Sequence, residues 1–509
     1  MAIEELIPEV PEVPEAPSKG LEAGSMGLLG GIMMGLSAAA PAYSIAATLG
    51  FVVVAVGVQS PIVMILAFVP MVCAAFAFKN LNSELSDCGT AFTWSRRVFG
   101  PYVSWMGGWC MALAGIVVMS TFIPLLGFYS FVLVGAPGIA QSGFWITVLG
   151  SALMILMVFV SWRGMHVAVG VEYVLVVLQY LGILVLAAAA MYFMFAGDAP
   201  EGSITPSLSW LNPFAIGDFA TFFKALLLCV FLFGGWDAAM SANEETSDSA
   251  STPGKAVVGS TGLLLLGYLA IGIATISYSG IGTSGIGLGN PANGGIAVDN
   301  LATGVFGDAG GRVMAAIIVI SICSSIPATL MPVTRGMLAM SVQGALSKSF
   351  RKIHPRFHTP GFGTWVALAM AEGICIVLSV ISTEVLEQMT LSLGIFFSFY
   401  YTLTAFSCVR WFWGRTSGIG KTLTHVILPL FGGIILTVAF FYTVIDLIKS
   451  PGTTILGLDS VLVITGLLLA AGAVWMLIQR RREPLFFKMK LTPQHPAEAH
   501  NIHGSVPDL

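Results

Sequence analysis

Two apolar stretches of this chain are interrupted by small residues at corresponding places in its two halves. The first reads GLSAAAPAY at residues 35–43, and the second reads FLFGGWD at residues 231–237. Inside a membrane, an interrupted helix leaves backbone N–H and C=O groups without partners, which is tolerated only beside buried polar groups or water. Matched interruptions in two repeats point to the substrate site of a transporter. The two stretches therefore predict both a class of fold and the place where a ligand binds.

The composition is that of an integral membrane protein. Of the 509 residues, 56% are hydrophobic and 9% are charged, whereas a soluble domain carries roughly 25% charged residues. Apolar segments that are long enough to cross a hydrocarbon core of about 30 Å recur along the chain. We therefore predict an all-α membrane protein with twelve transmembrane helices. The segments lie near 26–48, 56–78, 102–133, 143–162, 168–195, 219–241, 256–279, 311–341, 363–383, 388–412, 424–447 and 458–479.

Basic residues are distributed unevenly between the two sides of such a protein. If twelve segments alternate across the membrane, most Lys and Arg residues fall on the side of the two termini. This asymmetry follows the positive-inside rule, so we expect a multi-pass protein of the plasma membrane with cytoplasmic N- and C-termini. The opposite side carries little beyond Lys224, Arg312 and Lys449.

One transmembrane domain, residues 25–482, is expected between two tails. Residues 1–24 and 483–509 hold too little apolar content to bury, and we predict disordered cytoplasmic tails. Long connections at 79–101 and 280–310 occupy equivalent places in two halves of five spans each, on opposite faces. That arrangement indicates an inverted repeat. We place the first repeat at about 25–195, the second at about 215–412 and two additional helices at about 422–482.

The first interruption has two interpretations. Pro41 removes a backbone donor and clashes with the carbonyl four residues back, so a simple proline kink would explain it. Alternatively, freed backbone groups at Ser37, Ala38, Ala39 and Ala40 receive the carboxylate of a substrate, because helix N-termini favour anions.

The second interruption combines flexibility with a charge. Gly234 and Gly235 weaken an apolar helix, and Asp237 follows them near mid-membrane. A buried ionisable residue in a membrane costs several kcal/mol, so it is functional by default. Asp237 either caps the restarted helix through backbone N–H groups or binds a cationic group of the ligand.

Aromatic residues flank both interruptions. Phe231, Phe233 and Trp236 surround the second, and Tyr43 follows the first. Aromatic rings at these positions would close over a ligand or offer a face to a cation. Packing against lipid or other helices is the alternative for each of them.

Further patterns along the chain resemble a known family. The break at 231–237 is followed by NEETSD at 243–248 and PGK at 253–255, and similar patterns occupy 84–109 and 334–340. Together with the HPRFHTP run before the ninth span, they resemble the amino acid–polyamine–organocation permeases over nearly the whole chain.

The resemblance implies a LeuT-like core of five plus five helices, and alternating access around a substrate held between the two breaks. Phe231 matches the position of an aromatic gate over the substrate. Gly234 and Gly235 match the unwound segment whose carbonyls contact the substrate amine, and Asp237 matches an acidic position after it.

The chain departs from the family pattern at the positions that bear on ion coupling. Gln179 stands where some sodium-independent members carry a lysine, and a neutral amide cannot carry that charge. Ser324 and Ser325 resemble a hydroxyl pair that coordinates sodium in related folds. We predict no resident cofactor or metal and name these three residues as candidate coupling residues for H⁺ or Na⁺. A run of Gly35, Leu36 and Ser37 also replaces the Gly-x-Gly of many members.

The sequence therefore predicts a secondary active transporter of an amino acid. A transporter or exchanger of a polyamine or another organic amine is the alternative, and a membrane amino-acid sensor is the alternative outside transport. An enzyme is not expected, because no paired nucleophile and base is found. The expected partners are a small-molecule substrate and the lipid bilayer but no nucleic acid, since the basic clusters suit a membrane surface.

Overall fold

The computed structural model is a bundle of helices. It describes residues 19, 21, 24–136, 138–163, 165–381 and 385–488. The predicted N-terminal tail lies mostly outside these residues, as does most of the predicted C-terminal tail.

The first half of the chain is built from long helices. They are α1 (Leu28–Ala39), α2 (Pro41–Val56), α3 (Ser60–Glu84), α4 (Ala91–Phe99), α5 (Pro101–Leu133), α6 (Gly143–Trp162) and α7 (Met165–Ala196). Short 3₁₀ turns lie at Gly57–Gln59, Ile139–Gln141, Leu208–Leu211 and Pro213–Ala215.

The second half is also mostly helical, with several short helices among the long ones. Its helices are α8 (Phe219–Leu232), α9 (Ala238–Ser241), α10 (Thr252–Ser279), α11 (Ala297–Val342), α12 (Gly361–Ile381), α13 (Val385–Phe412), α14 (Ile419–Thr422), α15 (Leu428–Lys449), α16 (Ser460–Arg482) and α17 (Pro484–Lys488). A π-helical turn at Leu423–Ile427 joins α14 to α15. Further 3₁₀ turns lie at Asn243–Glu245, Pro291–Asn293 and Lys348–Arg351, and strands β1 (Thr454–Ile455) and β2 (Leu458–Asp459) form a small hairpin.

The helices have the length and composition of membrane spans. Nine described helical stretches are long and apolar enough to cross a bilayer, and the first of them, Leu28–Glu84, unites two predicted segments. Two shorter apolar helices, Phe219–Leu232 and Gly361–Val377, fall on two other predicted segments. The all-helical membrane class is confirmed, whereas the count of twelve crossings and the inverted repeat stay predictions.

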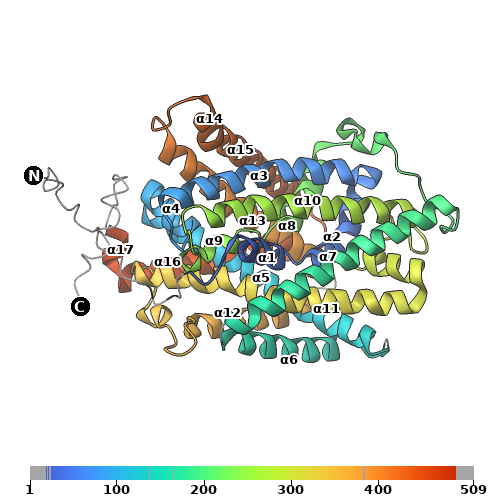
Figure 1. Cartoon of the computed structure of the whole chain (residues 1–509), viewed down its shortest axis with the longest axis horizontal. Coiled ribbons are helices and arrows are strands. Elements are labelled where there is room, and N and C mark those ends of the chain that lie inside the picture. The colour runs from blue at the N-terminus through green and yellow to red at the C-terminus, as the bar shows by residue number, and fades with distance from the viewer. Residues whose placement is uncertain are drawn as a thin grey trace, which may run out of the picture.

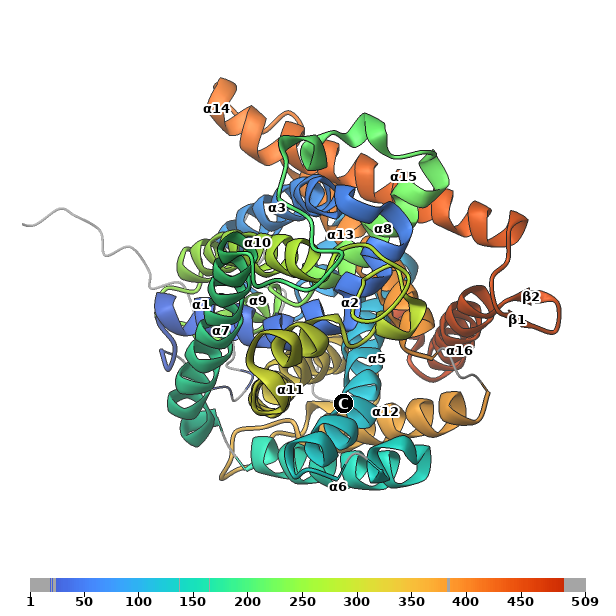
Figure 2. The same ribbon diagram turned by 90° about the vertical axis from the view of Figure 1, so that its right-hand side faces the viewer.

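Most of the long helices run roughly along the long axis of the molecule (Figure 1). Seen along that axis, α2 lies near the centre of the bundle and α1 runs towards it from one side, while α6 and α16 lie at the edge (Figure 2). Helices α1 and α2 pack against α7, α8, α10 and α11. The two interrupted stretches therefore lie in the interior, away from lipid.

Both described ends of the chain lie at one end of the bundle, which we call the terminal end. Near the start of the described chain, Lys19 pairs with Asp87. Near its end, Phe486 of α17 stacks on Phe92 of α4. Phe486 and Phe487 are buried, so the first residues of the predicted C-terminal tail form a packed helix. These residues differ from the predicted disordered tail because the two phenylalanines give them a large apolar surface to bury.

Small residues allow some helices to pack in backbone contact. A Cβ atom placed on Gly150 of α6 would overlap the carbonyl oxygen of Ile123 in α5, and one placed on Gly127 of α5 would overlap that of Ile146 in α6. Such close approach through small residues is a common way to hold membrane helices together. The pair α5 and α6 therefore depends on these two glycines.

Replacing Gly150→Ala should lower the stability of the protein, because α5 and α6 must separate to admit the methyl group. We expect a loss of about 1–3 kcal/mol, the usual cost of overpacking, seen as a lower midpoint of thermal unfolding in detergent. Gly373→Ala on α12 is the control, since nothing lies within 4 Å of its added Cβ. Equal midpoints for the two variants would contradict the packing of α5 on α6.

Candidate substrate site

The first predicted interruption is present between α1 and α2. Ala40 adopts a left-handed conformation, with φ 45° and ψ 65°, which is uncommon for a residue other than glycine. Its N–H donates to Ser37 O at 3.0 Å, and α2 restarts at Pro41, which has no N–H to leave unpaired. Proline thus ends one helix and begins the next at the same point.

The second interruption lies between α8 and α9. Gly235 has φ +97°, a conformation that L side chains rarely adopt. A Cβ atom on Gly235 would lie 2.8 Å from Ala38 O and 3.1 Å from Ala39 N. The two interruptions therefore face each other in backbone contact.

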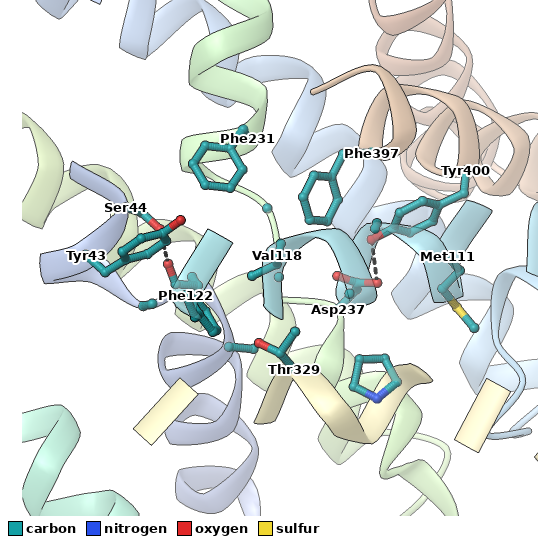
Figure 3. A pocket seen from close by; sticks show the side chains of 18 residues that line it. Tyr43, Ser44, Met111, Val118, Phe122, Phe231, Asp237, Thr329, Phe397 and Tyr400 are labelled. Carbon is teal, nitrogen blue, oxygen red and sulfur yellow. Dashed lines mark hydrogen bonds between the residues drawn. The ribbon is translucent and has the colours of Figure 1, made fainter. Parts of the chain in front are cut away.

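A cavity lies between the two interruptions and is closed on its other sides by α5, α11 and α13 (Figure 3). Eight of the residues predicted to bind substrate line it: Ala38, Ala39, Ala40, Tyr43, Phe231, Gly234, Gly235 and Asp237. The other lining residues are Ser44, Met111, Ala114, Gly115, Val118, Phe122, Thr329, Pro332, Phe397 and Tyr400.

Asp237 is the charged side chain of this cavity. It is 4% exposed, and its carboxylate accepts hydrogen bonds from Tyr400 OH at 3.0 Å and Tyr401 OH at 2.8 Å. The side chain makes no capping hydrogen bond to α9, so the capping interpretation of Asp237 is wrong. Two phenols on α13 hold the carboxylate instead, and Figure 3 shows Tyr400 pointing at it.

The contribution of α13 is not among the predicted site residues. Its signal in the sequence is the run FFSFYY at residues 396–401, which places two adjacent tyrosines inside a membrane helix. A buried Tyr hydroxyl needs a polar partner, and Asp237 needed donors. In the folded structure the two tyrosine hydroxyls and Asp237 are partners of one another, although they are far apart in sequence.

Four residues predicted to bind substrate do not line the cavity. Phe233 packs against Phe68 and Tyr268, and Trp236 stacks on Tyr401 with ring centroids 4.9 Å apart. These two aromatic residues pack against other helices and stabilise the broken helix outside the cavity.

Ser37 and Pro41 are the other two. Ser37 Oγ donates to Ser324 O at 2.8 Å and so ties α1 to α11. Pro41 starts α2 and is buried. Neither residue is among those that line the cavity.

The candidate coupling residues lie together behind the first interruption. Ser321 Oγ donates to Gln179 Oε1 at 2.5 Å and accepts from Tyr43 N–H at 3.3 Å. Gln179 Nε2 donates in turn to Ser324 Oγ at 3.3 Å. Ser325 Oγ donates to Ala38 O at 3.2 Å. The cluster is buried and joins α7 and α11 to the break; its part in ion coupling stays a prediction.

A small apolar cluster lies next to the first interruption, since Ala38 belongs to it. It is separate from the main core and lies between α1, α9 and α11. Its members are Met26, Met34, Ala38, Ala238, Ala242, Ala328 and Met331. Beside it, Arg335 Nη2 and Glu245 Oε1 form an ion pair at 2.6 Å, with both side chains almost fully buried.

A second charged group, around Lys19, joins the segment before α4 to the segment after α9. Lys19 Nζ lies 2.9 Å from Asp87 Oδ2 and 2.6 Å from Glu244 Oε1, and 3.5 Å from Cys88 Sγ. Its ammonium thereby occupies the space between three side chains that otherwise have the donor set of a metal site. Residue 19 belongs to the segment predicted to be a tail, and here it is part of the closure.

Mutual attraction keeps the Lys19 closure charged. Burial by itself would lower the pKa of Lys19, but the neighbouring acidic groups outweigh it and the pKa lies well above the usual lysine value. Burial by itself would raise the pKa of Asp87, but Lys19 and hydrogen bonds from Gly89 and Thr93 lower that pKa to about 2. The stabilisation is therefore present between about pH 4 and pH 10, is lost at lower pH as Asp87 protonates, and is lost at higher pH as Lys19 deprotonates.

An all-helical bundle whose broken helices enclose a central cavity has the architecture of a small-molecule permease. The chain belongs to the amino acid permease family, whose sequence model matches residues 26–467.

Three relatives illustrate the range of the family. The chain is 26% identical over 310 residues to the branched-chain amino acid permease BcaP of Bacillus subtilis, 57% of this chain and 62% of that protein. It is 23% identical to the methylthioribose transporter of Bacillus subtilis, over 61% of this chain and 65% of that protein. It is 25% identical to the low-affinity putrescine importer PlaP of Escherichia coli, over 79% of this chain and 85% of that protein. The chain thus spans less than two thirds of the first two relatives.

Replacing Lys19→Ala should open the terminal end and expose Cys88, because removing one partner of a buried ion pair leaves uncompensated charge. Since that loss is typically about 3–5 kcal/mol, we expect alkylation of Cys88 by a maleimide to become at least about tenfold faster. Mass spectrometry of the Cys88 peptide from purified protein measures the rate. Lys255→Ala, at an exposed position of α10, is the control. Unchanged alkylation of the Lys19 variant would show that residue 19 does not close this end.

Proposed function

We propose that this chain is a secondary active transporter that carries an amino acid across the plasma membrane by alternating access. The proposal includes twelve membrane crossings, two inverted repeats of five helices, two further helices, and cytoplasmic termini. The bias of basic residues towards one side supports that orientation. The meeting of both described chain ends near α4 supports an even number of crossings.

The contact between the two helix breaks is the observation that carries the proposal. On one side stand Ala38–Ala40 and the start of α2, where first-turn N–H groups and the helix dipole favour a negative group. On the other side stand the unwound backbone at Gly234–Gly235 and the carboxylate of Asp237. A zwitterionic amino acid has charges that complement both sides: its carboxylate suits the start of α2, and its ammonium suits Asp237.

The remaining cavity wall suits an apolar side chain. Phe122, Val118, Phe231 and Phe397 line it, and Tyr43 packs edge-on against Phe122 with ring centroids 4.9 Å apart. An aliphatic or aromatic substituent would displace water from these surfaces. Release towards the terminal end then requires the apolar cluster around Met331 and the ion pair of Arg335 with Glu245 to part.

An organic amine without a carboxylate is the second candidate substrate. Asp237 with its two tyrosine donors favours it, because this carboxylate recognises an amine whether or not a carboxylate is present. The putrescine importer among the relatives fits the same chemistry. Competition of uptake by an amino acid and by its decarboxylated product separates the two: only the former competes at an amino acid site.

Uptake into proteoliposomes tests the proposal directly. Purified protein is reconstituted and offered radiolabelled amino acids and amines across a preset pH or sodium gradient. We expect saturable uptake of at least one amino acid. Failure to move any amino acid or amine would overturn the proposed function.

Replacing Asp237→Asn should weaken substrate binding, because the variant removes the charge that faces the substrate amine. A hydrogen bond to a charged group contributes about 1.5–3 kcal/mol, so we expect the substrate Kd to rise about 10–100-fold. Tyr401→Phe is the matched control: it removes one donor to Asp237 but keeps the charge, and Tyr401 does not line the cavity. Substrate-induced thermal shift gives both affinities. Equal Kd values for Asp237→Asn and the wild type would rule out Asp237 as the amine-binding residue.

A further inference from the structure

A second cavity lies beside the first, on the other face of α11. Thr329 and Pro332 line the first cavity, whereas Met331 and Arg335 line the second. The second cavity is also bordered by Met34 of α1 and by Glu172 of α7, and α6 and α12 complete it. It contains a carboxylate and a guanidinium, and nothing in the proposed substrate site uses it.

Glu172 is buried in this cavity with an unpaired oxygen. Its side chain is 9% exposed, and Oε1 has no hydrogen-bond partner among the described residues. Ser37 is its polar neighbour, but the single hydroxyl hydrogen of Ser37 is donated to Ser324 O. An ionised carboxylate only accepts hydrogen bonds, so the surroundings offer Glu172 no donor hydrogen from Ser37. A protonated carboxyl group suits this environment better than a carboxylate, since it is neutral and brings a hydrogen of its own to donate.

Arg335 lies at the same cavity with part of its guanidinium unused. Nη2 pairs with Glu245 Oε1 at 2.6 Å, while Arg335 Nε and Glu245 Oε2 are buried without partners among the described residues. A guanidinium has five donors in a fixed planar fork and readily engages two oxygens at once. Arg335 is therefore paired with the carboxylate of Glu245. A second carboxyl group, that of Glu172, lines the same cavity as Arg335.

We propose that Glu172 is a proton-binding site that controls the Arg335–Glu245 ion pair, and that proton release from it opens the terminal end. While Glu172 is protonated it is neutral, and Arg335 stays with Glu245. When the O–H bond of the carboxyl breaks, the proton passes to a water molecule in the second cavity. The resulting carboxylate then competes with Glu245 for the guanidinium, and the hold of α11 on the segment after α9 weakens. This inference rests on the proposed transport function and deepens it by naming the coupling ion and its site.

Hydrogen bonds link this site to the substrate cavity. Ser37, next to Glu172, is bonded to Ser324, and Ser324 is bonded to Gln179. Gln179 is bonded to Ser321, which accepts from Tyr43 N–H at the start of α2. A shift of α1 when Glu172 ionises would therefore reach the first helix break directly. The neutral Gln179 then serves as a connector and carries no charge itself.

Few other titratable groups face Glu172. From the elements packed against α7, α11 contributes Arg335 to the same cavity. The other titratable residues of α11, which are Asp299, Asp308, Arg312 and Cys323, precede its cavity-lining residues, and Tyr43 of α2 lines the first cavity. Helix α10 carries Tyr268, Tyr278 and, at its exposed start, Lys255. Within Leu28–Ala39 of α1 and Gly143–Trp162 of α6 there is no titratable side chain. On α7, Tyr173 is adjacent and Tyr180 lies further along. The Lys19 closure keeps its charges between about pH 4 and pH 10, so it is not the source of a pH response near neutrality.

Transport driven by a pH gradient tests the inference. Wild-type protein in proteoliposomes should accumulate substrate when the outside is acidic, and a dye trapped inside should report substrate-dependent acidification. Glu172→Gln, a permanently neutral side chain of the same shape, should reduce gradient-driven accumulation at least tenfold and flatten the pH dependence of uptake. Glu372→Gln on α12 is the matched control. Glu372 is also an intramembrane carboxyl with one oxygen that has no partner among the described residues, but its other oxygen accepts from Ser151 and it does not line the second cavity, so this variant should keep both properties.

The outcomes separate this inference from the proposed function. Monodisperse elution and a substrate-induced thermal shift establish that the Glu172 variant is folded, and the dye experiment on the wild type needs no variant at all. Wild-type transport with no proton movement, or accumulation that follows a sodium gradient only, would overturn the proton site and leave the transport function standing. Unchanged proton-driven accumulation by Glu172→Gln would do the same. Absence of any transport by the wild type would overturn both.

Discussion

The centre of the molecule depends on one backbone contact, between Gly235 and the segment Ala38–Ala39. Two broken helices approach this closely only because residue 235 has no Cβ and the facing residues are alanines. The contact brings both sets of freed backbone groups to one cavity. Each break is then supported by a different helix: Ser321 and Ser325 of α11 bond the backbone of the first, and Tyr400 and Tyr401 of α13 bond the aspartate of the second.

Local chemistry made the breaks and most helices predictable from sequence. Pro41, the Gly234–Gly235 pair and the long apolar segments act within a few residues of themselves, so their effects survive without tertiary information. The directions of the Ser37, Phe233 and Trp236 side chains could not be predicted in this way. The left-handed residues Ala40 and Gly235 interrupt the helical periodicity from which side-chain directions are inferred. The tyrosines that hold Asp237 lie more than 160 residues later in the chain, and no local pattern connects them.

The terminal end combines two charged groups of different character. Lys19 has acidic partners on two sides, and its pairing is complete and insensitive to pH near neutrality. Arg335, by contrast, has one engaged carboxylate, and Arg335 Nε, Glu245 Oε2 and Glu172 Oε1 lack partners among the described residues. Complete pairing favours one arrangement, whereas leftover donors and acceptors allow a second arrangement of similar energy. The first group suits a fixed closure and the second suits a moving one.

Lys19 also touches both halves of the chain, since Asp87 precedes α4 and Glu244 follows α9. The binding place of Lys19 is complete only after the second half of the chain has been synthesised and has packed against the first. The Lys19 segment therefore packs late in folding. A shortened chain that begins after Lys19 would lose both of these contacts.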